Sequence, residues 1–169
     1  TKANEISKYK GYARFESIQN NFSLLNPRFH DELANVCRLE NISLLPYSPM
    51  AGGVLSGKYC GGFYPEGSRF ATYLKESNKR VQAMAHRFVN ERTLEATKKY
   101  LELAKEYEVS PVTLAISYSK HFDFVASTIV GARKIEQLDD SLKAFDFKIS
   151  NELLKRIEII QKDILYPMG

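Results

Sequence analysis

The stretch 44–59, LLPYSPMAGGVLSGKY, changes character halfway along its length. Its first part is a short apolar run, which is typical of a buried β-strand, and it ends at the tripeptide Tyr-Ser-Pro (47–49). The second part is rich in glycine, and Gly52 and Gly53 favour a loop whose backbone can approach a ligand closely. The sequence therefore predicts a strand that delivers an aromatic ring, a hydroxyl group and a flexible loop to one point.

Two further segments share the features of the predicted strand at 43–49. They are FESIQ (15–19) and ASTIVGA (126–132), which are short, apolar and bounded by turn residues. Because helical patterns lie between these segments, the sequence predicts an α/β fold with parallel strands and helices packed outside. Three strands are too few for a sheet that is covered on both faces, so we expect the chain to be part of a larger barrel or sheet.

The expected helices follow from apolar spacing and from capping residues. Ser110 is a predicted N-cap with proline at the first helical position, and Ser150 is a predicted N-cap of the last helix. RKIEQLDDSLKAF (133–145) carries apolar residues at spacings of three and four, namely Ile135, Leu138, Leu142 and Phe145. In contrast, we expect an irregular stretch at 60–90 that begins as a loop, and a loop of this length is more often functional than idle. The remaining expected helices are a first helix ending near Gly11, 27–41 and 91–109.

Composition and charge exclude several classes of protein. The chain has 169 residues, of which 44% are hydrophobic and 26% are charged, as in one globular domain. It has no apolar run of about 20 residues and no signal-peptide core, so we expect a cytoplasmic protein without a membrane partner. The net charge of +4 is spread among nearby acidic residues, which favours a mixed solvated surface over a nucleic-acid interface.

The cysteines and histidines give no sign of a metal centre. Cys37 and Cys60 lie far apart and lack the Cys-x-x-Cys spacing, which favours two reduced thiols over a disulfide or a metal site. The three histidines are widely separated as well, so no zinc cluster is expected. They are His30, His86 and His121.

The end of the strand at 43–49 is the first candidate binding point. Ligands of parallel α/β folds bind at the carboxyl ends of strands. Tyr47 offers a ring for stacking on a flat heterocycle, while Ser48 and the backbone N–H groups of residues 50–53 suit phosphate oxygens. A tyrosine packed in the core, followed by an ordinary glycine turn, explains this motif equally well.

The end of the predicted strand at 126–132 is the second candidate. It leads through Gly131 into a helix near Lys134, and a helix N-terminus attracts anions. Arg133 and Lys134 lie at that terminus, although a polar helix face with ordinary basic residues fits the same pattern. Taken together, the two strand ends favour a nucleotide. Three further polar residues share one face of this helix, and they are Gln137, Asp140 and Ser141.

Three side chains elsewhere suit the same ligand. Gln19 ends the first predicted strand with an amide that both donates and accepts, which matches a carboxamide such as that of nicotinamide. Lys58 and Arg69 lie in or next to the glycine-rich loop and suit phosphate groups, Arg69 through its forked guanidinium. Solvated loop charges are the alternative explanation for both basic residues.

Four motifs in the same order resemble the C-terminal half of an aldo-keto reductase. They are SIQNNFSLLN, LLPYSPMAGGVLSGKY, EGSRF and STIVGARKIEQLDDSLKAF, and the most similar branch includes the potassium-channel β-subunits. The resemblance implies a TIM-type (β/α)8 barrel that binds NADPH at the carboxyl ends of its strands. Residues 1–169 would form one unit with about three β/α units, strands six to eight, and a C-terminal helix. Residues 50–90 would hold the loop that covers the cofactor and the segment after it.

The resemblance also implies a role for each candidate residue. Tyr47 matches the residue that stacks on nicotinamide, and Gln19 matches the residue that holds the carboxamide. The pyrophosphate turn corresponds to Ser48, Pro49, Met50, Ala51 and Gly52. Loop contacts to phosphate correspond to Lys58 and Arg69, and contacts to the 2′-phosphate and ribose to Gly131, Arg133 and Gln137. Asp140 and Ser141 stand where the family commonly has Glu-Asn at the adenine.

The family's catalytic Asp, Tyr, Lys and His come from its first four strands, which match no part of this chain. We therefore expect no catalytic residue here and no activity from this chain alone, while the parent protein would reduce aldehydes and ketones by hydride transfer. A non-catalytic NADPH-binding sensor subunit is the alternative, and nucleic-acid binding is a third hypothesis. Because an open half-barrel exposes apolar edges, we also expect it either to self-associate or to be a piece of a longer protein.

Overall fold

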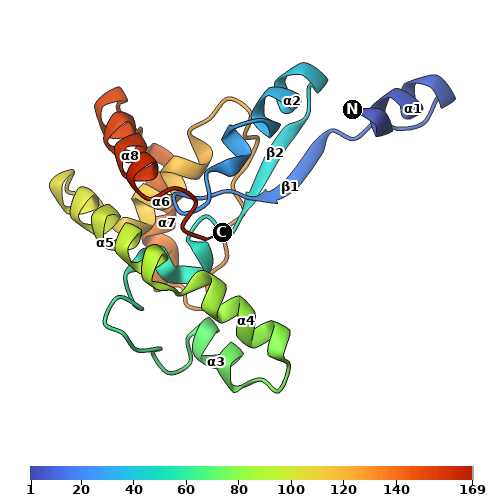
Figure 1. Ribbon diagram of the computed structural model, residues 1–169. Coiled ribbons are helices and arrows are strands. Elements are labelled where there is room, and N and C mark those ends of the chain that lie inside the picture. The colour runs from blue at the N-terminus through green and yellow to red at the C-terminus, as the bar shows by residue number, and fades with distance from the viewer. Residues whose placement is uncertain (169) are drawn as a thin grey trace.

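A short parallel sheet carries the loops of interest in the computed structural model, which describes residues 1–168 (Figure 1). Strands β1 (Ser17–Asn21) and β2 (Ser43–Tyr47) pair in parallel, and Asn21 lies beside Tyr47. The strand predicted at 43–49 is thus confirmed, while β1 begins and ends two residues later than predicted. Side chains of partner residues in a parallel pair point to the same face of the sheet.

Most of the helices lie to one side of this sheet, and α1 stands apart from them (Figure 1). The region also contains two 3-10 helices, η1 (Arg28–His30) and η2 (Ala51–Ser56). The α-helices among the described residues are α1 (Lys2–Lys10), α2 (Leu33–Glu40), α3 (Arg69–Lys75), α4 (Lys79–Phe88), α5 (Glu91–Glu106), α6 (Pro111–Lys120), α7 (Glu136–Asp146) and α8 (Asn151–Asp163).

The prediction of a third regular strand at 126–132 is wrong. Val125 forms an isolated parallel bridge with Leu44, and the N–H of Ala126 donates to the carbonyl of Leu44 at 3.0 Å. After Ala126 the pairing lapses until the N–H of Ile129 donates to the carbonyl of Pro46 at 2.8 Å. The segment follows β2 without a regular ladder because its other side has no strand among the described residues.

The helix predicted from the apolar spacing of 133–145 is present, but most of these apolar side chains do not pack on the core. The helix begins at Glu136 and packs on α6 through small or polar contacts, such as the Thr113 hydroxyl that donates to the carbonyl of Asp140 at 2.8 Å. Ala144 is buried, whereas Ile135 and Phe145 are 77% and 81% exposed. The apolar face of α7 therefore points away from the core.

The stretch 60–90 is more ordered than the sequence suggested. Residues 57–68 form a loop, but α3 and α4 follow, each with a side-chain cap at its N-terminus. Ser68 accepts from the N–H of Ala71, and Asn78 accepts from the N–H of Arg80. These local caps explain why helices form in a region whose glycine and proline content favoured a loop.

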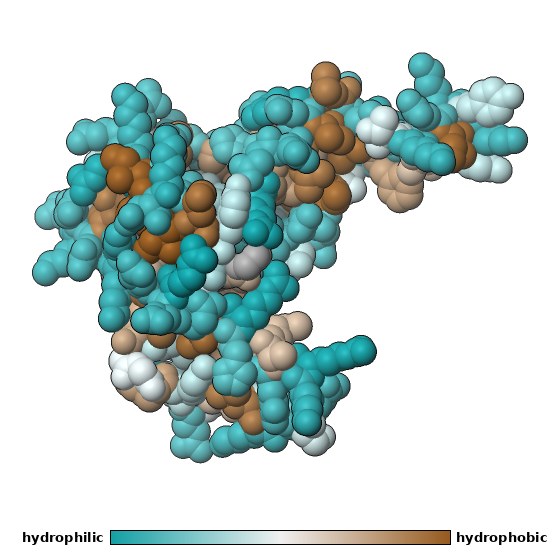
Figure 2. Space-filling view, viewed as in Figure 1, coloured by the Kyte–Doolittle hydropathy of each residue, from teal (hydrophilic) through white to brown (hydrophobic). Residues whose placement is uncertain are grey.

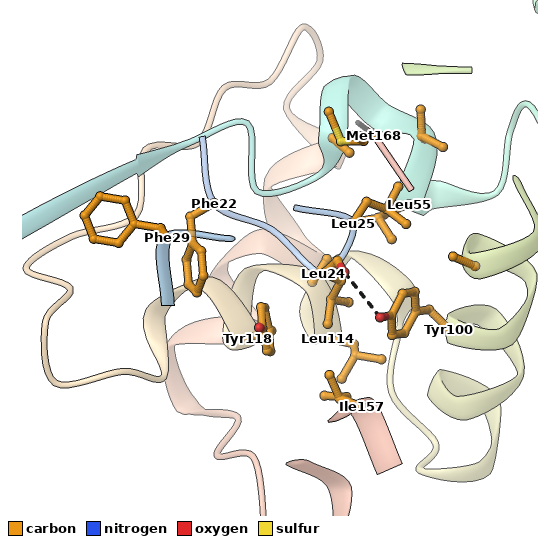
Figure 3. Packing of buried hydrophobic residues seen from close by; sticks show 14 of the residues in the cluster. Phe22, Leu24, Leu25, Phe29, Leu55, Tyr100, Leu114, Tyr118, Ile157 and Met168 are labelled. Atoms are coloured by element: carbon orange, nitrogen blue, oxygen red, sulfur yellow. Dashed lines mark hydrogen bonds between the residues drawn. The ribbon is translucent and has the colours of Figure 1, made fainter. Parts of the chain in front are cut away.

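The core lies beneath the sheet, between the chain after β1 and the helices α5, α6 and α8 (Figure 3). Phe22 stacks on Tyr118 with ring centroids 5.6 Å apart. The hydroxyl of Tyr100 donates to the carbonyl of Leu24 at 3.2 Å, which satisfies a polar group in an apolar region (Figure 3). Burial raises the pKa of the Tyr100 and Tyr118 hydroxyls, so both stay neutral and act as structural groups.

Candidate functional site

The carboxyl ends of β1 and β2 bring three polar side chains to one face of the sheet. The register pairs Gln19 with Leu45 and Asn21 with Tyr47, so Gln19, Asn21 and Tyr47 share that face. Tyr47 is 43% exposed. The alternative of an ordinary core tyrosine therefore does not describe this ring, which is open to stacking.

Asn21 is the residue that sequence reasoning missed. Its side-chain oxygen Oδ1 is buried and has no hydrogen-bond partner. Such an oxygen is costly to leave unsatisfied, so a donor that reached it would relieve that cost. The signal was present in the sequence, because a residue two positions after Gln19 points to the same side of a strand.

The turn after β2 has an unusual backbone. Ser48 and Ala51 have positive φ angles of 60° and 48°, and Gly52 and Gly53 follow with 67° and 95°. The Ser48 hydroxyl accepts from the N–H of Gly52 at 3.1 Å. The N–H groups of Ala51 and Gly53 donate to the carbonyls of Ser48 and Met50, each at 2.8 Å. Three of the amides expected to bind phosphate are thus used within the turn, and an anion would compete with these bonds.

Gly52 is required at its position for a steric reason. A Cβ atom there would lie 2.5 Å from Cζ of Phe70, in the first turn of α3. The ring of Phe70 therefore lies against the turn, and α3 covers it from the side. Pro49 and Ala51 are buried, and Met50 packs partly against the core, which holds the turn in place.

The two basic residues of this region, Lys58 and Arg69, both lie near this contact. The Nζ atom of Lys58 is 2.8 Å from where a Cβ of Gly53 would stand, so the lysine lies beside the turn. Arg69 begins α3, next to Phe70, and is exposed. Both cations are accessible from solvent near the glycine turn.

Arg133 joins the two halves of the candidate site. Its Nη1 atom donates to the carbonyl of Gly67, in the loop that precedes α3. The side-chain oxygen of Gln137 accepts from the N–H groups of Arg133 and Lys134 at 2.9 and 3.3 Å. Gln137 therefore already accepts hydrogen bonds from the backbone N–H groups that were predicted to bind an anion. Gly131 has open space around it, so packing gives no reason for a glycine there.

Asp140 and Ser141 lie farther along α7 and make local contacts. The Asp140 carboxylate is 3.1 Å from Nζ of Lys143, and the Ser141 hydroxyl donates to the carbonyl of Gln137 at 3.2 Å. Asp140 also lines an open hollow of about 430 Å³ between α6 and α7, together with Ser110 and Thr113. Gly131, Arg133, Gln137 and Ser141 do not line this hollow, so it lies apart from the rest of the candidate site.

The other chemistry-bearing residues form no centre of their own. Over residues 1–168, no three His, Cys, Asp or Glu side chains gather as a metal site would require. Cys37 and Cys60 are free, and burial raises the pKa of both thiols. No helix in the described part of the chain is long and apolar enough to cross a membrane.

Comparison with known proteins gives a family match. The model of the aldo/keto reductase family matches residues 1–162. This covers nearly the whole chain, including both strands and the segments around Tyr47 and Arg133.

Curated relatives point the same way. The chain is 32% identical to "Protein tas" of Escherichia coli (strain K12) over 91% of its own length and 42% of the relative's. It is 29% identical to a "Putative voltage-gated potassium channel subunit beta" of Schizosaccharomyces pombe, with 81% and 39% covered. It is 31% identical to an "L-glyceraldehyde 3-phosphate reductase" of Escherichia coli O157:H7, with 83% and 40% covered. The match thus spans about two fifths of the length of these relatives.

Proposed function

Because the chain belongs to the aldo/keto reductase family, we propose that it forms the NADPH-binding part of a carbonyl reductase. The family has a TIM-barrel fold and uses NAD(P)H, and the chain is a partial α/β piece of that fold. We assign this piece to the C-terminal part of the barrel, with about three β/α units and a C-terminal helix. Residues 1–169 form one unit in this proposal, although Gly169 lies outside the described residues.

The observation that carries the proposal is the face shared by Gln19, Asn21 and Tyr47. An exposed ring beside a buried, unpartnered amide oxygen suits a flat heterocycle with a carboxamide, because the ring stacks and the oxygen accepts from the amide. The residues present therefore fit a nicotinamide. Gln19 adds a second amide on the same face.

The phosphates would lie along the turn and the two basic segments. In this proposal Ser48, Gly52 and the adjoining residues 49–51 line the pyrophosphate, while Lys58 and Arg69 bind phosphate oxygens from the covering loop. The 2′-phosphate and the adenosine would extend along α7. The residues assigned there are Gly131, Arg133, Gln137, Asp140 and Ser141.

In this proposal, carbonyl reduction requires a proton donor that this chain does not supply. When bound, NADPH supplies a hydride, and the chain's own residues would orient the nicotinamide and hold its phosphates. The proton donor for the carbonyl oxygen would come from another part of the parent protein, which would reduce aldehydes and ketones. We propose that the 169-residue chain alone is inactive, so any NADPH-dependent carbonyl reduction by the purified chain contradicts this part.

A titration of the chain with NADPH and NADH by calorimetry tests the binding proposal. The wild-type chain is expected to prefer NADPH, and Arg133→Ala is expected to weaken NADPH binding by about tenfold to a hundredfold while changing NADH binding little, because a charge-assisted hydrogen bond is lost. Arg156→Ala on α8 is the matched control, since Arg156 pairs with Glu106 away from this region. A folded wild-type chain that binds neither nucleotide overturns the proposal.

A second candidate is a non-catalytic, NADPH-binding regulatory or sensor subunit. The similarity to a putative potassium-channel β-subunit of Schizosaccharomyces pombe favours it. An assay of the full-length parent protein with NADPH and a panel of aldehydes and ketones distinguishes the two candidate functions. Turnover supports the reductase, whereas tight NADPH binding without turnover supports the sensor.

A further inference from the structure

The two helices beside the glycine turn bury few of their own side chains. Helix α3 buries Phe70 and Ala71, and α4 buries Ala85 alone. The outer surface of α4 is mostly hydrophilic (Figure 2). Helices with few buried contacts open more readily than the core of a protein does. The positions of α3 and α4 therefore depend on what holds their ends.

The end of α4 is held by residues 164–168, which follow α8 and are called the strap here. After α8 the chain turns back toward the centre of the molecule (Figure 1). Nε of Arg87, near the end of α4, donates to the carbonyl of Met168 at 3.2 Å. Nη2 of Arg92, in the first turn of α5, donates to the carbonyl of Leu165 at 2.8 Å. Two guanidinium groups from the corner between α4 and α5 thus bind the backbone of the strap.

Asn90 connects the same corner to the strap with an uncharged side chain. Its Nδ2 atom donates to the carbonyls of Arg87 at 2.9 Å and Pro167 at 3.4 Å. Its side-chain oxygen caps α5 by accepting from the N–H of Thr93 at 3.0 Å. One amide group therefore holds the end of α4, the start of α5 and the strap together.

Tyr166 fastens the strap on its other side, to the chain that follows β1. Its hydroxyl donates to Oδ2 of Asp31 at 2.7 Å, and the guanidinium carbon of Arg28 lies 4.4 Å from its ring centroid. The φ angle of Tyr166 is 45°, a left-handed conformation that a non-glycine residue keeps only where its surroundings enforce it. The strap thus bridges η1 and the corner between α4 and α5.

The strap also connects to the glycine turn through side-chain packing. Met168 is 2% exposed and points into the same cluster as Leu55 of η2 (Figure 3). Phe88, the last residue of α4, packs on Phe70 with ring centroids 5.2 Å apart. A Cβ atom on Gly52 would lie 3.5 Å from Cδ1 of Phe88. A shift of the end of α4 would therefore move both rings that lie against the turn.

We propose that the strap positions the glycine turn and α3, and that it thereby sets the shape of the nucleotide site. The identity of the ligand rests on the proposed function, whereas the positioning rests on the contacts of the strap alone. The strap residues touch none of the groups assigned to the nucleotide, so they are positioning residues. Release of the strap on either side would let the corner between α4 and α5 move away from the turn.

Hydrogen exchange of the ligand-free 169-residue chain, followed by mass spectrometry, tests the positioning. Arg87→Ala releases the strap from α4, and Tyr166→Ala releases it from η1. Each variant is expected to speed amide exchange in η2 and α3 about tenfold, because a charge-assisted bond or a ring contact is lost. Exchange in α6, which lies in the core, is expected to stay unchanged.

Two further variants serve as controls. Arg87→Lys keeps a charged donor at the same place and is expected to restore slow exchange in η2 and α3. Arg156→Ala removes a contact with Glu106 between α8 and α5, at the end of α5 that the strap does not touch, and is expected to change nothing there. Unchanged exchange in both strap variants overturns the proposal. So does equally faster exchange in α6, since the strap would then only stabilise the whole fold.

A calorimetric titration with NADPH measures the consequence for binding. Arg87→Ala and Tyr166→Ala are each expected to weaken NADPH binding about tenfold, although neither residue is assigned to the ligand. Faster exchange in the turn with unchanged NADPH affinity overturns the link between the strap and the site. A wild-type chain that binds no NADPH contradicts the proposed function, and the exchange experiment then decides by itself whether the strap positions the turn.

Discussion

Among single residues, Asn21 would link stability to ligand binding most directly in the proposed site. Its buried amide oxygen has no partner, and a group in that condition costs about 1–3 kcal/mol of stability. Sites that await a ligand carry such costs because the missing partner arrives with the ligand. Tyr47, its neighbour across the sheet, is exposed, as stacking on the proposed nicotinamide requires.

We expect Asn21→Leu to stabilise the chain by about 1 kcal/mol while it weakens NADPH binding by about tenfold. The leucine removes the unsatisfied oxygen, and with it the proposed acceptor for the carboxamide. Urea unfolding and a calorimetric titration measure the two effects on the same sample. Unchanged NADPH affinity in a folded variant would remove Asn21 from the site.

Gly52 gives a second prediction, about the turn. Gly52→Ala places a Cβ 2.5 Å from the ring of Phe70 at a φ of 67°, so steric overlap adds to backbone strain. We expect a loss of about 3 kcal/mol or more, with about 1–2 kcal/mol of it from the left-handed backbone. Urea unfolding measures the loss.

Gly62 is the matched control for that substitution. Its φ is 77°, but a Cβ there would meet nothing within 4 Å. Gly62→Ala should therefore cost only the backbone strain, about 1–2 kcal/mol. Equal losses in the two variants would mean that the Phe70 contact with the turn does not form in solution.

Among the elements, an ion pair joins α2 to the segment that follows α6. Arg38 donates to Asp123 through Nε and Nη2 at 2.9 and 2.7 Å, and these bonds lower the pKa of the Asp123 carboxyl. The carboxyl binds a proton less readily in the folded chain than in the unfolded one. Its stabilising effect is therefore present above the ordinary aspartate pKa and is lost as pH falls through the lowered folded value.

We expect wild-type chain to melt at a higher temperature than Asp123→Asn at pH 7, and the difference to shrink as pH falls below about 4. Both residues are exposed, so the difference will be small. Thermal melts from pH 7 to pH 2.5 measure it, with Glu66→Gln in the 57–68 loop as a control. A difference that grows toward low pH would contradict the assigned direction.

The elements that depend on local signals were predictable from the sequence. Ser110 and Ser150 cap their helices as predicted, accepting from the N–H groups of Thr113 and Leu153 at 3.0 and 3.1 Å. β2 was also predicted, because its apolar run ends at a clear turn. These features need only neighbours within a few residues.

Features that depend on distant partners were not predictable. Within residues 1–168 the segment 126–132 lacks a neighbour on one side, so its apolar pattern misled. The spacing at 133–145 predicted a helix correctly, but it did not show that no described element covers the apolar face of α7. In the candidate site, the motif left open whether Tyr47 is exposed or packed in the core, and the structure shows the ring 43% exposed. The internal bonds of the turn and the bonds that Gln137 accepts from the N–H groups of Arg133 and Lys134 follow from backbone geometry that sequence patterns do not contain.

In the whole molecule, the candidate site is assembled from segments far apart in the chain. Its residues come from four segments spread along the chain, namely 19–21, 47–53, 67–70 and 131–137. The hydrogen bond from Arg133 to Gly67 joins the last two of these segments. A ligand that touches all four would hold the sheet, the covering loop and α7 together. Ligand binding should therefore raise the stability of the whole chain rather than of one loop.

We expect NADPH at 100 times its dissociation constant to stabilise the chain by about 2.7 kcal/mol, which corresponds to a rise in Tm of about 5–10 °C. Differential scanning fluorimetry measures the rise, with adenosine at the same concentration as a control that lacks the phosphates and the nicotinamide. Arg133→Ala should shift the NADPH response to higher concentration, because it removes the cation assigned to the 2′-phosphate. A calorimetrically saturated chain whose Tm does not move would show that NADPH binds folded and unfolded chains alike, which is incompatible with a site built from four separate segments.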